Sequence, residues 1–150
     1  MKYLVSFAFL IFVLMLSGCS WSFDYVVVND SDKPIDTRYG IKKTPNSFAP
    51  PEMPSTLTSS ELVENENLHW VRLGHNRYRV DWKNRIVEVQ IMPHEALLVV
   101  AAYSPNMDAK DFPLEYIEVR GQNGTLTFTG EQALRCFSED STRFRVLRYN

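Results

Sequence analysis

Short runs of β-branched and aromatic residues, separated by turn-forming residues, recur along most of this chain. Several runs alternate apolar and polar residues, which is the period of a β-strand with one buried face. The clearest runs are 23–29, 35–39, 96–103, 114–120, 125–130 and 142–149. No alternation of strands with helices appears, so a nucleotide-binding α/β fold is disfavoured. We therefore expect an all-β fold, an antiparallel two-sheet β-sandwich with an immunoglobulin-like arrangement.

The segment 76–91 predicts a β-hairpin in one register. With a two-residue turn at Lys83–Asn84, apolar side chains face one another and an arginine faces a glutamate. The facing pairs are Tyr78 with Val89, Val80 with Val87, Arg79 with Glu88 and Arg77 with Gln90, and Trp82 continues the apolar side. A slip of one residue would move every apolar side chain to the other face. The register therefore predicts both an apolar face and an Arg79–Glu88 ion pair.

Two segments depart from this pattern. Residues 40–60 contain several prolines, which central strands exclude, so they predict one long loop. Long loops in compact domains are often functional, and we expect the apolar side chains of Phe48, Met53 and Leu57 to be exposed there for a binding partner. Residues 131–137 predict a short helix, because Thr129 and Gln132 have the spacing of a capping box.

The first residues form an apolar leader that ends at a cysteine. Lys2 is followed by an apolar run over 3–16, which has the length of a secretory signal and is too short to span a bilayer. The run ends in Leu16-Ser17-Gly18-Cys19. This motif resembles the lipobox of bacterial lipoproteins. The resemblance implies a signal peptide over 1–18, cleavage before Cys19, and lipid on the Cys19 thiol and on the new amino terminus.

The same resemblance predicts the location of the protein. Serine rather than aspartate follows the cysteine, at Ser20, and in enteric-type bacteria this resembles the signal for the outer membrane. We therefore expect a protein of the cell envelope, held by its lipid on the outer membrane and facing the periplasm. Residues 19–22 would form a short lipidated tether, and 23–150 a single domain.

Charge and cysteine content exclude some classes of protein. Without Lys2, the 16 basic residues fall to 15, against 18 acidic residues, so the mature chain is not the basic protein that nucleic-acid binding requires. If Cys19 carries lipid, Cys136 has no partner for a disulfide within the chain. We interpret Cys136 as a buried thiol, with a reactive nucleophile or an intermolecular disulfide as alternatives.

Motifs that would indicate catalysis or a cofactor do not occur in the sequence. Phosphate loops, CxxC pairs, HExxH helices and Gly-x-Ser-x-Gly elbows are missing, and we expect neither a catalytic residue nor a cofactor. A metal site of His69, His75 and Glu95 can be imagined, but neither histidine has a partner at ligand spacing, and no metal is expected.

A second candidate for partner binding lies near the end of the chain. Arg143 and Arg145 should share one face of a strand, opposite Phe144 and Val146, and arginines bind carboxylates or phosphates through two parallel hydrogen bonds. The other interpretation is a solvated face on which the arginines pair with local acidic residues.

These features predict a non-enzymatic, membrane-anchored envelope lipoprotein with a protein-binding or structural accessory role. Its partners would be the membrane, through the lipid on Cys19, and another envelope protein. One alternative is a periplasmic immunity or inhibitor lipoprotein that blocks a toxin or hydrolase. A second alternative is an enzyme in which His94 activates Cys136, which requires that folding bring the two side chains together.

Overall fold

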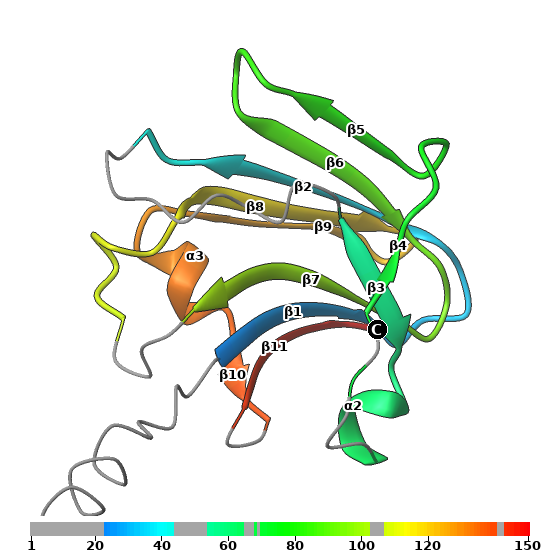
Figure 1. Ribbon diagram of the computed structural model, residues 1–150. Coiled ribbons are helices and arrows are strands. Elements are labelled where there is room, and N and C mark those ends of the chain that lie inside the picture. Colours follow the sequence, from blue (N-terminus) through cyan, green and yellow to red (C-terminus); the bar gives the residue numbers. More distant parts are fainter. Residues whose placement is uncertain (1–22, 44–53, 65–67, 69, 103–106, 141–142) are drawn as a thin grey trace, which may run out of the picture.

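The fold is described from a computed structural model of the 150-residue chain, shown in Figure 1. The structure describes residues 23–43, 54–64, 68, 70–102, 107–140 and 143–150. The signal peptide, Cys19, Ser20, Phe48 and Met53 lie outside the described residues. No helix in the described part of the chain is long and apolar enough to cross a membrane.

Two sheets packed face to face make up the molecule (Figure 1). The first sheet contains, in spatial order, β10 (Ser138–Glu139), β11 (Phe144–Tyr149), β1 (Phe23–Asn29), β7 (Glu95–Ala102), β3 (Ser55–Thr58) and β4 (Val71–Arg72). The second sheet contains β5 (Tyr78–Asp81), β6 (Ile86–Ile91), β2 (Ile35–Ile41), β8 (Leu114–Gly121) and β9 (Gly124–Thr129). The prediction of an all-β sandwich of two sheets is confirmed, and its immunoglobulin-like arrangement stays a prediction.

One strand pair departs from the antiparallel prediction. β1 and β11 run parallel, with Val26 beside Val146 and Val28 beside Arg148. Antiparallel strands can be joined by a tight hairpin, whereas parallel strands need a long connection. These two are the first and last strands that the structure describes, so the chain between them forms that connection.

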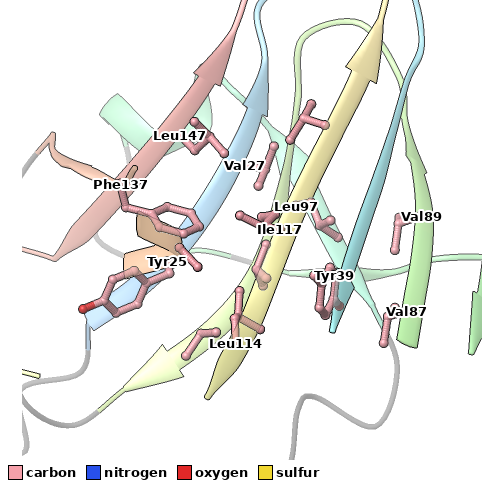
Figure 2. Packing of buried hydrophobic residues seen from close by; sticks show 14 of the residues in the cluster. Tyr25, Val27, Tyr39, Val87, Val89, Leu97, Leu114, Ile117, Phe137 and Leu147 are labelled. Carbon is pink, nitrogen blue, oxygen red and sulfur yellow. The ribbon is translucent and has the colours of Figure 1, made fainter. Parts of the chain in front are cut away.

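β1 is buried along its full length: its apolar side chains pack on both faces of the sheet, and its two polar residues, Asp24 and Asn29, are buried as well. Tyr25 and Val27 face the main core between the two sheets, whereas Val26 and Val28 face a second, smaller core. Figure 2 shows the main core, with side chains of the first sheet against those of the second: Val27, Leu97 and Leu147 against Tyr39, Val89 and Ile117. The short helix α2 (Glu61–Glu64) contributes Leu62 to the smaller core.

The predicted hairpin is confirmed in its register. Tyr78 pairs with Val89 and Val80 with Val87, as the alternation of side chains required. The predicted ion pair is wrong: Glu88 pairs instead with Arg38 of β2, at 3.4 Å. β2 supplies this nearer partner because it flanks β6 on the side opposite β5. Trp82 lies beyond the end of β5 and is 67% exposed.

The long loop predicted over 40–60 is wrong at both of its ends. β2 continues to Ile41, and Ser55–Thr58 forms β3, which pairs with β7. Leu57 therefore is not an exposed loop side chain, since it is 4% exposed and packs in the smaller core. Proline excludes only its own position from a central strand, and the segment after Pro54 is rich in the β-branched residues that favour strands. The short helix predicted over 131–137 is present as α3 (Gln132–Arg135).

Candidate functional site

Arg143 and Arg145 do not form the open basic face that would hold a partner. The Nε atom of Arg143 lies 3.6 Å from the carboxylate of Asp24. Burial raises the pKa of the Asp24 carboxyl, and the charge of Arg143 opposes that rise. Arg145 is 17% exposed in its side chain, pairs with Glu139 at 3.6 Å, and places its guanidinium 5.3 Å from the centre of the Phe23 ring. Both arginines thus contact residues at the start of β1, Asp24 and Phe23 respectively.

The aromatic ring of Phe23 is itself in the core, 6% exposed, and does not project from the domain. Its position beneath Arg145 explains how a charged residue is accommodated in a largely buried part of β11. A guanidinium over an aromatic ring is attracted by the negative face of that ring. The interpretation of Arg145 as a residue paired with local acidic groups is the one that agrees with this geometry.

Cys136 and His94 lie near opposite ends of β1. Cys136 precedes Phe137, whose ring packs against Tyr25 at 5.4 Å between centroids. The backbone N–H of His94 donates instead to the carbonyl oxygen of Asn29 at the other end of the strand, 2.8 Å away. Tyr25 and Asn29 are about 13 Å apart at the usual rise of a strand residue. His94 therefore cannot take a proton from the Cys136 thiol.

The environment of Cys136 also keeps its thiol protonated. Burial raises the pKa of the thiol to about 12, and the Sγ–H group donates to the carbonyl oxygen of Ala133 at 3.4 Å. The thiolate, not the thiol, is the reactive nucleophile. Cys136 is half-buried, not fully buried as the sequence suggested, and it packs against the main core at the end of α3.

The imagined metal site is not assembled among the described residues. His75 Nδ1 lies 2.9 Å from the hydroxyl of Tyr78, and Glu95 is held by Arg77. His69 lies outside the described residues. Elsewhere in the described part of the chain, no three histidine, cysteine or acidic side chains lie close enough to hold a metal ion.

A hollow lies on the outer face of the second sheet. It is an open groove of about 560 Å³ that crosses β5, β6, β2 and β8. Strand pairing places its charged and polar side chains in two rows. The first row is Arg79, Glu88, Arg38 and Glu118, and the second is Arg77, Gln90, Asp36 and Arg120. The rows face solvent because they alternate along each strand with buried residues of the main core.

Positive and negative side chains alternate along the first row. Arg38 pairs with Glu88 at 3.4 Å, and Glu118 pairs with Arg120 of the second row at 2.9 Å. Within the described part of the chain, Arg79 makes no ion pair, and it lines both the groove and a smaller hollow of about 200 Å³. Arg79 therefore offers a guanidinium whose hydrogen-bond donors are available to a carboxylate of another molecule.

Arg77, which lines the groove directly before β5, forms an ion pair with Glu95 of the first sheet. Arg77 donates to Glu95 through both terminal nitrogens, with Nη1 to Oε1 at 3.1 Å, and Nη2 also donates to the carbonyl oxygen of Gln90 at 3.0 Å. Glu95 begins β7 and accepts a further hydrogen bond from the Met92 N–H at 2.9 Å. Burial alone would raise the pKa of the Glu95 carboxyl, but these hydrogen bonds and the charge of Arg77 hold it below its usual value.

The sequence contained the signal for this groove. The polar positions of 35–39, 76–91 and 114–120 alternate with apolar ones, which identifies them as one face of each strand. Local alternation does not show which strands are neighbours, so the rows across four strands could not be read from it.

Comparisons with known proteins give no relative for this arrangement. No protein-family model matches the sequence, no curated protein matches it, and no solved structure matches the fold.

Proposed function

We propose that this chain is a bacterial envelope lipoprotein, anchored in a membrane through Cys19, that acts by binding another envelope protein and not by catalysis. One observation carries the proposal: a lipobox cysteine stands almost directly before a fully buried central strand. Only Ser20, Trp21 and Ser22 separate Cys19 from Phe23, the first residue of β1. A tether of this length spans at most ~10–14 Å. The domain would therefore lie against the membrane surface.

The mode of anchoring agrees with that geometry. A single acyl chain holds a protein on a membrane only marginally, whereas several chains hold it stably. The lipoprotein resemblance supplies several chains on one residue. Ser20 favours the outer membrane, with the domain on its periplasmic side. Because β1 lies between β7 and β11, the anchor would be attached to the centre of the first sheet.

Replacement of Cys19 by alanine (C19A) tests the anchor. We expect the variant to incorporate no labelled fatty acid and to accumulate as the uncleaved precursor, because the thiol is the site of lipid attachment. The measurements are labelling with a palmitate analogue and the mobility of the protein on a gel. Ser17→Ala, which keeps a small residue in the lipobox, is the control and should mature normally. Normal processing of C19A would contradict the proposed anchor.

The groove of the second sheet is the surface that we propose for the protein partner. Small-molecule sites are mostly apolar and enclosed, whereas this groove is open and lined by charged side chains. Alternating charges across a sheet favour a partner with the complementary alternation, since every mismatch would place like charges together. Binding that depends on exposed charges weakens as the salt concentration rises.

Reversal of the charge of Arg79 (R79E) tests that surface. The variant is expected to lower recovery of the partner about tenfold or more after crosslinking in intact cells, because the introduced carboxylate would stand directly opposite Glu88 and repel the partner's acidic group. Lys33→Glu, an equal charge change at an exposed position in the turn after β1, should leave recovery unchanged. Mass spectrometry of the crosslinked products identifies the partner. Equal recovery with R79E and with the wild-type chain would exclude the groove as the binding surface.

A further inference from the structure

The four outer strands of the described sheets differ sharply in how well their edges are protected. β4 and β10 have two residues each, and β5 carries Arg79 and Asp81. Short strands and charged side chains are the usual means of preventing another strand from adding to an edge. β9 has neither protection: Gly124–Thr129 is six residues long, uncharged, and exposed at every position except the half-buried Phe128. Among the outer strands of the described residues, β9 is therefore the one whose edge is open to a further strand.

The backbone of β9 presents regularly spaced donors and acceptors on that edge. Gly121 and Gly124 flank a two-residue turn, so they form the hydrogen-bonded pair that closes the hairpin. Hydrogen-bonded and non-hydrogen-bonded pairs alternate along an antiparallel ladder. Leu126 and Phe128 therefore direct their N–H and C=O groups to β8. Thr125, Thr127 and Thr129 direct theirs away from the sheet, as an incoming strand requires.

We propose that a second copy of this chain binds at this edge, with the two β9 strands antiparallel around a two-fold axis at Thr127. This register pairs all three threonines through the outward backbone groups: Thr127 with Thr127, and Thr125 with Thr129. It also places Leu126 of each copy opposite Phe128 of the other, on the side that faces the main core. Leu126 is 39% exposed in the single chain, and Phe128 is only partly buried.

The strand itself favours a second copy over a different partner. From Thr125 to Thr129 the polar and apolar residues are placed symmetrically around Thr127. In an antiparallel pair of two β9 strands, threonines therefore face threonines and apolar side chains face apolar side chains. It carries no charge, so self-pairing brings no like charges together on β9. A two-fold interface of this kind uses the same surface on both copies.

The position of the proposed axis is also compatible with membrane anchoring. The axis of an antiparallel strand pair is perpendicular to its sheet, so both copies keep their first sheet on the same side. Each β1, where the chain leaves its leader, lies in that first sheet. Two copies confined to one membrane would meet at a raised effective concentration, which favours pairing through an interface of modest area. The dimer does not depend on the groove or on its partner.

The test uses the full chain with two different affinity tags, co-expressed and extracted from membranes in mild detergent. Wild-type copies are expected to co-purify. Thr127→Glu (T127E) in both copies should lower co-purification about tenfold or more, because like charges would face each other across the axis beside Glu118 of β8. Thr127→Pro, which removes an outward N–H and leaves the β8 ladder intact, should give the same loss. Pairing T127E with Thr127→Lys should restore co-purification, because the facing charges then attract.

Val71→Glu is the matched control, since it adds the same charge to an exposed edge of the other sheet. It should leave co-purification unchanged, and thermal unfolding of each variant should remain close to that of the wild type. Wild-type copies that do not co-purify would overturn the proposal, and so would copies that still co-purify with T127E. If Val71→Glu abolished co-purification and T127E did not, the proposal would also be overturned, because the interface would then lie on the first sheet.

Discussion

Replacement of Phe112 by alanine (F112A) is expected to lower the free energy of unfolding by about 3–5 kcal/mol, the usual cost of deleting a buried aromatic side chain. Phe112 is fully buried, and its ring centre lies 5.0 Å from that of Tyr25 and 6.2 Å from that of Phe137. These three rings join the segment before β8, the start of β1 and the segment after α3. Deletion of the Phe112 ring would leave a cavity that its neighbours cannot fill.

Equilibrium unfolding in urea, followed by tryptophan fluorescence, measures this loss. Trp82→Ala removes a larger aromatic side chain from a position that is 67% exposed, and it should cost less than about 1 kcal/mol. Phe112→Leu should recover a substantial part of the loss, because it restores apolar volume in the same place. A cost for F112A no larger than that of the Trp82 variant would mean that the three rings do not form a joint core.

Phe112 also shows the limit of what the sequence could predict. The segment 104–113 predicts a loop, and Phe112 indeed lies outside the strands. Alternation identifies buried positions within strands, but it gives no information about a side chain in an irregular segment. The burial of Phe112 arises from Tyr25 and Phe137, which are distant in the sequence. Contacts of this kind depend on how the strands are arranged.

Most of the longer strands were predictable because each one is specified by neighbouring residues, whereas β3 (Ser55–Thr58) lies in the segment that was predicted as a loop. The hairpin of β5 and β6 has the predicted register, because only one strand register is compatible with both the tight turn and the two alternating segments. The parallel pairing of β1 with β11 was not predictable in the same way. β1 has apolar side chains on both faces over several residues, and β11 has them at Val146 and Leu147. This pattern indicates a central position, but it does not show which strand lies beside it.

The candidate site was predictable only in part for the same reason. The sequence identified Arg143 and Arg145 as residues of one strand, but not that Asp24 and Glu139 would lie beside them. The alternation in 76–91 predicts that Arg79 faces Glu88. It does not predict that Arg38 pairs with Glu88, because that contact requires β2 to lie beside β6. Ion pairs across a sheet depend on strand order, which local patterns do not encode.

Replacement of Arg77 by methionine (R77M) is the second prediction with a large effect on stability. We expect a loss of about 1.5–3 kcal/mol in the free energy of unfolding at neutral pH, the usual value of hydrogen bonds to a charged group. Arg77 and Glu95 are 23% and 25% exposed in their side chains, so solvent screens the pair only partly. Methionine keeps the apolar stem of the side chain, and the variant therefore isolates the loss of the guanidinium. Val80→Ala, on the same hairpin, is a control without charge.

The effect of R77M should depend on pH in a direction that the pKa of Glu95 determines. Arg77 holds the pKa of Glu95 in the folded protein below its usual value of 4.5. A carboxyl whose pKa is lowered by folding contributes its full stability above the unfolded-state pKa and loses it as the pH falls through the folded-state pKa. The difference between wild type and R77M should thus be largest above about pH 5 and should shrink below pH 4.5. Urea unfolding at several pH values measures it, with the Val80 variant expected to show a constant difference. A difference in the free energy of unfolding between wild type and R77M that increased as the pH fell would contradict the assignment of Arg77 as a group that lowers the pKa of Glu95.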